Sequence, residues 1–197
     1  MCSEVVHLPI VKTTLWPDES ATQAFAQTLA AQPALRNAFI ELRGDLGAGK
    51  TTLVRHLLGA LGVSGRIKSP TYAVVESYEL PDLAVWHFDF FRFHDPQEWE
   101  DAGFRDIFAS QGLKLVEWPD KAAGHLPLAD LVVQLAMQLD MSNEAARQVT
   151  LSAQTAVGLA LIQHFDSCIS IPEKGQKPLE PIESFQMPMV LNSDTQP

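Results

Sequence analysis

A glycine-rich segment of eight residues limits the possible folds of this chain more strongly than any other part of it. The segment runs from Gly44 to Thr51 and reads Gly-Asp-Leu-Gly-Ala-Gly-Lys-Thr, which matches G-x-x-x-x-G-K-T/S at every fixed position. Glycine allows positive φ and a close approach of the backbone to phosphate oxygens, and successive N–H groups at a helix start form an anion-binding nest. The segment therefore predicts a loop that binds nucleotide phosphates.

The residues on either side of this segment fit such a loop. Phe39–Leu42 is a short apolar run typical of a buried strand, and Lys50–Leu61 has a helical pattern that ends at Gly62. A strand, the loop and then a helix is the context that the motif requires. In this context we expect Lys50 to neutralise charge on the β- and γ-phosphates and the Thr51 hydroxyl to bind Mg²⁺.

Further strands and helices are expected around this unit. Pro81-Asp82 separates two strand-like runs and indicates a hairpin, and two late strands are expected to pair with each other. The expected strands are Val5–Leu8, Tyr72–Leu80, Leu83–Asp89, Leu113–Glu117, Leu131–Leu139 and Gln148–Leu151, and the expected helices are one capped by Asp18 or Ser20, then Pro96–Asp101, Phe104–Ala109 and Thr155–Phe165.

Two of the expected strands end in a carboxylate. Asp89 and Glu117 each follow an apolar run, and ligands of parallel α/β sheets gather at the carboxyl ends of the strands, so both are candidate Mg²⁺ ligands. Thr71, in the loop before a strand, is a candidate for sensing the γ-phosphate, as switch loops do. The alternatives are an Asp89 that caps a helix or pairs with Arg92, and a Thr71 that bonds only within its turn.

Other residues narrow the choice of nucleotide and metal. The Asn-Lys-x-Asp element typical of guanine recognition is absent, and Pro119-Asp120-Lys121-Ala122 is the nearest segment, so ATP is favoured over GTP. His87, His94 and His125 lack the spacing of zinc ligands, and we interpret them as ordinary structural or surface residues.

Composition bounds the setting in which the chain acts. Its 197 residues allow one sizeable domain, and a net charge of −10 argues against direct binding of nucleic-acid phosphates. No membrane-spanning run or secretory signal is visible, and only Cys2 and Cys168 occur, so we expect a reducing cytoplasm. Five of the thirteen prolines fall within residues 167–197, so a domain at 1–166 followed by a disordered tail is expected.

The chain resembles one known family through four motifs in a fixed order. They are Gly44–Thr52, Lys68-Ser69-Pro70-Thr71-Tyr72, His87-Phe88-Asp89-Phe90-Phe91-Arg92 and Glu117-Trp118-Pro119. Together they are similar to the bacterial TsaE family, from about Val5 to Leu161. The resemblance implies a single α/β P-loop nucleotide-binding domain, with a central mostly parallel sheet, added antiparallel strands and helices on both faces.

The resemblance also implies an activity and its partners. The family is the ATPase that joins TsaB and TsaD, which transfer threonylcarbamoyl to adenosine 37 of tRNAs that read ANN codons. It implies ATP and Mg²⁺ as cofactors, contact with tRNA only through the complex, and no membrane. A small-molecule kinase that uses the same loop is the alternative, and a nucleotide-dependent assembly factor whose hydrolysis is incidental is a third reading.

The matching motifs assign roles to individual residues. Lys50, Asp89, Glu117 and Thr71 are the implied catalytic residues, Thr51 and Glu117 are the implied Mg²⁺ ligands, and Asp89 is a ligand, water-holder or base. The nucleotide-binding residues implied by the resemblance are Gly47, Ala48, Gly49, Lys50, Thr51, Thr52, Thr22, Trp118 and Arg147. One departure is Phe91, since the family has tyrosine there and no role that needs a phenolic hydroxyl can be carried over.

Overall fold

The computed structural model describes residues 10–93, 98–99, 102–138 and 146–166. Its strands are β1 (Ile10–Trp16), β2 (Phe39–Arg43), β3 (Val75–Leu80), β4 (Leu83–Asp89), β5 (Leu113–Glu117), β6 (Leu131–Met137) and β7 (Arg147–Ala153). Its α-helices are α1 (Glu19–Ala30), α2 (Lys50–Ala60), α4 (Phe104–Ala109) and α5 (Ala156–Ile162), and short 3-10 helices are η1 (Pro33–Asn37), η2 (Pro119–Ala122) and η3 (Gln163–Asp166).

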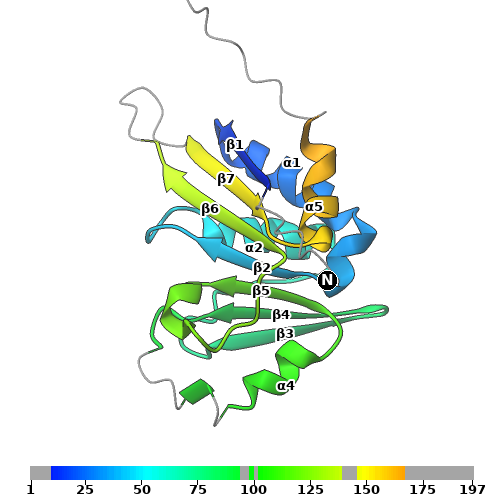
Figure 1. The fold of residues 1–197 in the computed structure, drawn as a ribbon, viewed down its shortest axis with the longest axis vertical. Coiled ribbons are helices and arrows are strands. Elements are labelled where there is room, and N and C mark those ends of the chain that lie inside the picture. Colours follow the sequence, from blue (N-terminus) through cyan, green and yellow to red (C-terminus); the bar gives the residue numbers. More distant parts are fainter. Residues whose placement is uncertain (1–9, 94–97, 100–101, 139–145, 167–197) are drawn as a thin grey trace, which may run out of the picture.

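The strands form one mixed sheet with a parallel centre. Within the described residues the strand order is β1-β7-β6-β2-β5-β4-β3, and β6, β2, β5 and β4 run parallel to one another (Figure 1). β3 pairs with β4, and β7 pairs with β6 and β1, all in antiparallel register. The predicted fold class, a mostly parallel centre with added antiparallel strands, is therefore confirmed.

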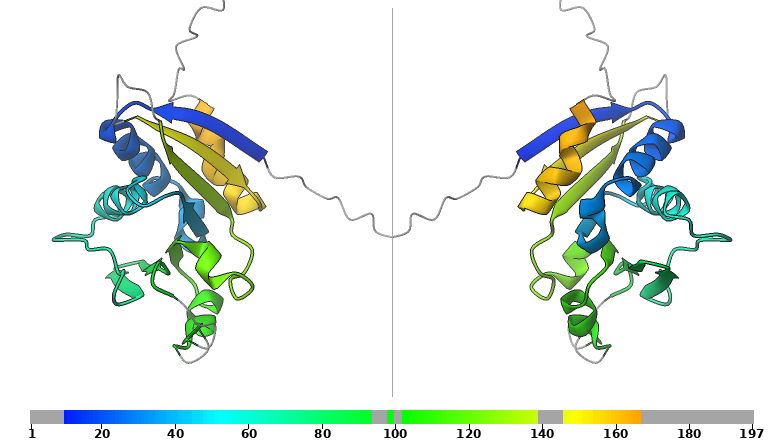
Figure 2. Two further views of the ribbon diagram at one scale, coloured as in Figure 1. Left: turned by 90° about the vertical axis from the view of Figure 1, so that its left-hand side faces the viewer. Right: turned by 90° about the vertical axis from the view of Figure 1, so that its right-hand side faces the viewer.

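Two apolar clusters cover the two faces of the sheet. The larger cluster joins leucines of α1, α2 and α5 to one face, and Phe25 of α1 contacts Trp16 and Phe165 with ring centroids 4.8 and 4.5 Å apart. The second cluster is aromatic and packs Phe104 of α4 against Phe88 of β4 on the other face. In Figures 1 and 2, α4 lies at the opposite end of the sheet from α1 and α5.

Most predicted elements occur close to their expected positions. The hairpin, the pairing of the late strands and the helix capped by Asp18 are confirmed, and the Asp18 side chain accepts from the backbone N–H groups of Ser20 and Ala21. Strand β1 was not predicted. The strand expected at Val5–Leu8, most of the helix expected at Pro96–Asp101 and the tail at 167–197 lie outside the described residues.

The parallel centre brings three strand ends to one edge of the sheet. Leu42 of β2 is in register with Glu117 of β5, and Glu117 is in register with Asp89 of β4. The loop that follows β2 therefore begins beside the two carboxylates. Among the helices of the described part of the chain, none has both the length and the apolar character needed to cross a lipid bilayer.

Candidate functional site

The glycine-rich loop connects β2 to α2, as its pattern predicts. Gly49 occupies the N-cap of α2 with φ of 105°, and no side chain caps the helix, so the amides of its first turn are available to an anion. Gly44 has φ of 133°, and a Cβ atom at this position would collide with the carbonyl oxygen of Leu135 in β6. The backbone of this loop therefore requires glycine at both ends.

Lys50 extends from the first turn of α2 back across the loop. Its Nζ donates to the carbonyls of Gly44 at 2.6 Å and Asp45 at 2.9 Å, and it lies 4.0 Å from the centroid of the Trp118 ring. Burial lowers the pKa of Lys50, and the negative charges of Glu117, Asp89 and Asp45 partly oppose that shift. Among the described residues, the ammonium group donates hydrogen bonds to two neutral carbonyls and faces an aromatic ring, while the three carboxylates act on it without a direct hydrogen bond.

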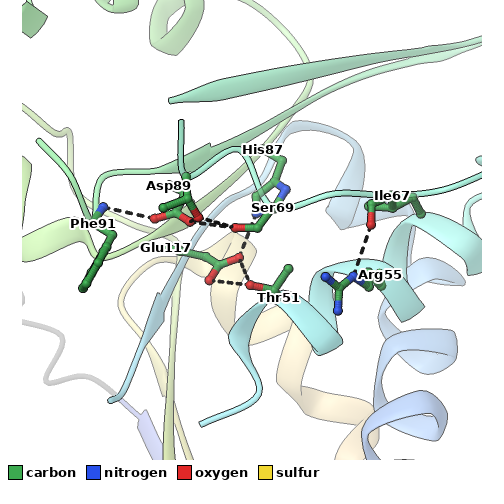
Figure 3. A network of polar contacts seen from close by, with 9 residues as sticks. Thr51, Arg55, Ile67, Ser69, His87, Asp89, Phe91 and Glu117 are labelled. Atoms are coloured by element: carbon green, nitrogen blue, oxygen red, sulfur yellow. Dashed lines mark hydrogen bonds and ion pairs between the residues drawn. The ribbon is translucent and has the colours of Figure 1, made fainter. Parts of the chain in front are cut away.

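Glu117 closes the site from the end of β5. Its side chain is buried, and the Thr51 hydroxyl lies 2.8 Å from its Oε1 and 3.0 Å from its Oε2. His87 of β4 places Nε2 2.9 Å from the same Oε1 (Figure 3). The next residue, Trp118, has a backbone φ of 59°, which is uncommon for residues other than glycine, and its indole ring packs against the Lys50 ammonium group.

Asp89 holds the loop that precedes β3. Its Oδ2 accepts from the hydroxyls of Ser69 at 2.7 Å and Thr71 at 2.6 Å, and its Oδ1 accepts from the backbone N–H of Phe91 at 3.0 Å. Figure 3 shows Ser69, Thr51 and His87 gathered around the two carboxylates. On the far side of the same loop, Arg55 of α2 donates from Nε to the Ile67 carbonyl at 3.2 Å.

These groups surround a single pocket of about 220 Å³. Its walls combine backbone from the glycine-rich loop, one lysine, three threonines, a serine, two carboxylates and two aromatic rings. The lining residues are Leu46, Gly47, Gly49, Lys50, Thr51, Thr52, Ser69, Thr71, Asp89, Phe91, Glu117 and Trp118. A polar, cation-bearing pocket at the start of a helix is suited to a phosphate chain.

Nine of the predicted site residues line this pocket, and three do not. Ala48 is buried in the loop, and its carbonyl accepts from Arg147 Nε at 3.1 Å, so Arg147 contacts the loop backbone. Thr22 is buried in α1 and does not line the pocket. Contact with a nucleotide stays a prediction for all twelve residues.

Sequence reasoning did not identify several residues of this pocket. Ser69 and Phe91 line it, and the Phe91 ring lies 5.0 Å from the Trp118 ring. His87, which we interpreted as an ordinary structural or surface residue, does not line the pocket; it is fully buried, so it is not a surface residue, and it contacts Glu117. The period of a strand holds a signal for it, because residues two apart share a face and His87 is two before Asp89.

The fold and this pocket define a P-loop nucleotide-binding protein. A family model described as threonylcarbamoyl adenosine biosynthesis protein TsaE matches residues 16–149, which is more than half of the chain. The chain therefore belongs to the TsaE family.

Similar proteins occur in Haemophilus influenzae and Bacillus subtilis. A protein of Haemophilus influenzae named tRNA threonylcarbamoyladenosine biosynthesis protein TsaE is 39% identical over 155 residues, which cover 77% of this chain and 95% of the relative. A protein of the same name from Bacillus subtilis is 34% identical over 140 residues, covering 71% and 83%. The crystal structure of Bacillus subtilis YdiB matches with a TM-score of 0.65 and 25% identity, covering 81% of this chain and 97% of the other.

Proposed function

We propose that this protein is a Mg²⁺-dependent ATPase of tRNA threonylcarbamoyladenosine biosynthesis. The observation that carries the proposal is the convergence of the phosphate-binding loop, Lys50 and the Thr51–Glu117 pair on one pocket. The names of the relatives from Haemophilus influenzae and Bacillus subtilis support the pathway. By the family resemblance, it would act with TsaB and TsaD on adenosine 37 of tRNAs that read ANN codons, and its net charge of −10 favours contact with tRNA only through those partners.

Lys50 is the group that supports triphosphate binding most directly. Within the described residues its hydrogen bonds go to two neutral carbonyls, and charge-assisted bonds to phosphate oxygens are about twice as strong as bonds to neutral acceptors. The loop amides would bind the same phosphate chain. Together they would stabilise the negative charge that develops as water attacks the γ-phosphorus and ADP leaves.

The residues of the pocket also fit Mg²⁺. The Thr51 hydroxyl and the Glu117 carboxylate lie in contact, Asp89 lies on the neighbouring strand, and all three supply the oxygen ligands that Mg²⁺ prefers. No three acidic, histidine or cysteine side chains of the described residues form a ready metal cluster. This agrees with Mg²⁺, which usually takes one or two carboxylates and completes its shell with phosphate and water. When bound, the ion would neutralise charge on the phosphates.

Asp89 has a second task in this proposal. Its carboxylate accepts from Ser69 and Thr71, so it orients the two loop hydroxyls beside the pocket. These hydroxyls, with Asp89 behind them, are suited to hold the attacking water. From its place at the end of β4, Asp89 could instead act as a metal ligand or as a base.

Among its described residues, the pocket has no arginine that could accelerate phosphoryl transfer. No arginine occurs among its lining residues, and Arg92 instead lies over the Tyr72 ring, 4.3 Å from its centroid. An arginine supplied to the transferred phosphate accelerates related enzymes by about 10³ to 10⁵. We therefore expect slow hydrolysis by the isolated protein and faster hydrolysis with its partners.

Replacing Lys50 tests the assignment. Lys50→Ala should abolish ATP hydrolysis while the circular-dichroism spectrum stays that of the wild type, because the side chain contacts two carbonyls and one ring and its removal leaves the sheet intact. Lys114→Ala is the matched control, since Lys114 is equally buried but does not line the pocket. Hydrolysis at the wild-type rate by Lys50→Ala would refute the assignment, and a phosphorylated acceptor in place of free phosphate would favour a kinase.

A further inference from the structure

His87 is the buried polar residue at this site that the proposed function leaves without a task. Its side chain has no exposed area, and it does not line the pocket. On β4 it shares a face with Val85 and Asp89, and Val85 packs in the same cluster as the leucines of α2. Its Nε2 lies 2.9 Å from Oε1 of Glu117, so it reaches the carboxylate from within the sheet.

The hydrogen-bond partners determine which ring nitrogen donates. A carboxylate that binds Mg²⁺ is ionised and can only accept hydrogen bonds, so every partner of Glu117 must be a donor, as the Thr51 hydroxyl is. His87 must therefore donate from Nε2. Its Nδ1 is buried without a partner among the described residues, and a ring with its proton on Nε2 leaves no buried N–H unpaired there. The arrangement gives the imidazole one polar contact, and that contact is Glu117.

We propose that His87 is a positioning residue that fixes the Glu117 carboxylate for Mg²⁺ binding. The inference rests on the proposed function, because it assigns a task at the same metal site. The N–H of His87 occupies one lone-pair position of Oε1 and so limits rotation of the carboxylate, whose two oxygens lie 2.8 and 3.0 Å from the Thr51 hydroxyl. Mg²⁺ demands near-octahedral geometry, so a carboxylate free to rotate is a poorer ligand than one held in place.

The size of the effect follows from other metal sites. Loss of a hydrogen-bond partner behind a metal ligand typically costs about 10–100-fold in metal affinity. Removing the N–H of His87 should therefore raise the Mg²⁺ concentration needed for tight nucleotide binding by about that factor. Nucleotide binding without metal should not change, because His87 contacts neither the glycine-rich loop nor Lys50.

Two amide substitutions separate the donor from the bulk of the side chain. His87→Gln places an N–H close to the position of Nε2, whereas the shorter His87→Asn cannot reach Glu117. Val85→Ala is the control for lost stability, since Val85 is fully buried on the same face of β4 and its apolar side chain cannot form a hydrogen bond with Glu117. Calorimetric titration with a non-hydrolysable ATP analogue, in EDTA and over a range of Mg²⁺ concentrations, gives the readout, and thermal melting reports folding.

The expected result is a selective defect in the response to Mg²⁺. His87→Asn requires about 10–100-fold more Mg²⁺ and keeps its affinity in EDTA, while His87→Gln and Val85→Ala respond as the wild type does. If His87→Asn does not fold, His87→Met, which has similar reach and no N–H, takes its place. A wild-type response from His87→Asn, or an equal defect in His87→Gln, overturns the inference alone. A wild-type protein that ignores Mg²⁺ overturns the proposed function and this inference together.

Discussion

At the scale of single residues, Glu117 connects the phosphate loop to the sheet. It lies at the end of β5, accepts from Thr51 in the first turn of α2 and from His87 in β4, and is almost fully buried. A buried carboxylate with these partners is costly to place, so its position between the helix and two strands argues for a specific task. That task, in our account, is to bind Mg²⁺ beside Thr51.

Glu117→Gln should separate nucleotide binding from hydrolysis. The amide keeps the size of the side chain but removes the charge that would bind Mg²⁺, so hydrolysis should fall by more than about 100-fold, since even outer partners of a metal ligand cost up to that factor. Binding of ATP in EDTA should persist. The matched control is Glu41→Gln, because Glu41 is also buried but bonds to Arg43 outside the pocket.

The assay for this pair of variants is release of free phosphate. Wild-type release by Glu117→Gln would contradict its role at the metal. Full support of tRNA modification by a Glu117→Gln protein that no longer hydrolyses ATP would instead show that hydrolysis is incidental, as in an assembly factor.

Gly44 is the loop residue for which the structure predicts the largest loss of stability. Its φ of 133° is unsuited to other residues, and a Cβ atom would also overlap the backbone carbonyl of Leu135. Gly44→Ala should therefore lower the free energy of unfolding by more than Gly62→Ala, where φ is 98° and the added Cβ would lie in open space. Positive φ alone costs about 1–2 kcal/mol. Chemical denaturation of the two variants measures the difference, and equal losses would contradict the predicted collision.

At the scale of elements, the turn between the Thr71 loop and β3 is strained. Val74 is β-branched and has φ of 66°, with its N–H donating to the Pro70 carbonyl at 2.6 Å and its own carbonyl accepting from Asp89 at 2.9 Å. Strain of this kind costs about 1–3 kcal/mol and persists where the surrounding structure imposes it. Here the turn places Thr71 against Asp89.

Asparagine at position 74 should relieve part of that strain. Asparagine adopts positive φ more readily than valine, so Val74→Asn should cost at least about 1 kcal/mol less than the same change at Val75. Val75 is the matched control, because it is also half-buried and packs against the same aromatic cluster, but has strand geometry. Urea denaturation of both variants measures the loss in free energy of unfolding, and an equal loss at the two positions would show that Val74 is not strained.

The elements also show what could be predicted from sequence. The bounds of β4 and β5 match their predictions, since each is a compact apolar run that ends in a carboxylate. Strand β3 begins at Val75 and not at Tyr72, because the turn with Val74 precedes it, and positive φ at valine has no sequence signal. Strand β1 was missed because Lys12, Thr13 and Thr14 interrupt its apolar pattern at an edge of the sheet.

The site likewise contains residues that could be predicted from the sequence and contacts that could not. The loop, Lys50, Thr51, Asp89 and Glu117 could be named from sequence, because their spacing follows from a motif and from strand ends. The bonds from Ser69 and Thr71 to Asp89, and from His87 to Glu117, join residues 18 to 30 positions apart. Such contacts depend on the packing of strands and loops and not on local pattern.

At the scale of the whole molecule, the sheet order brings the ends of β2, β4 and β5, and with them the groups of the pocket, to one edge. The pocket contains no arginine among its lining residues, and exposed side chains lie near it, with Leu46 74% and Tyr72 85% exposed. In our proposal, a protein partner that contacts this edge would supply an arginine, which the described lining of the pocket does not contain. The central claim is therefore that this edge binds Mg²⁺ and ATP, and that partners increase its activity.

Calorimetric titration with ATP at millimolar Mg²⁺ tests this claim most directly, with the protein alone and then mixed with TsaB and TsaD. We predict saturable heat from the wild type, a strong loss of that heat in Lys50→Ala, and faster phosphate release when the partners are present. The absence of any binding heat from the wild-type protein, both alone and with the partners, would contradict the account.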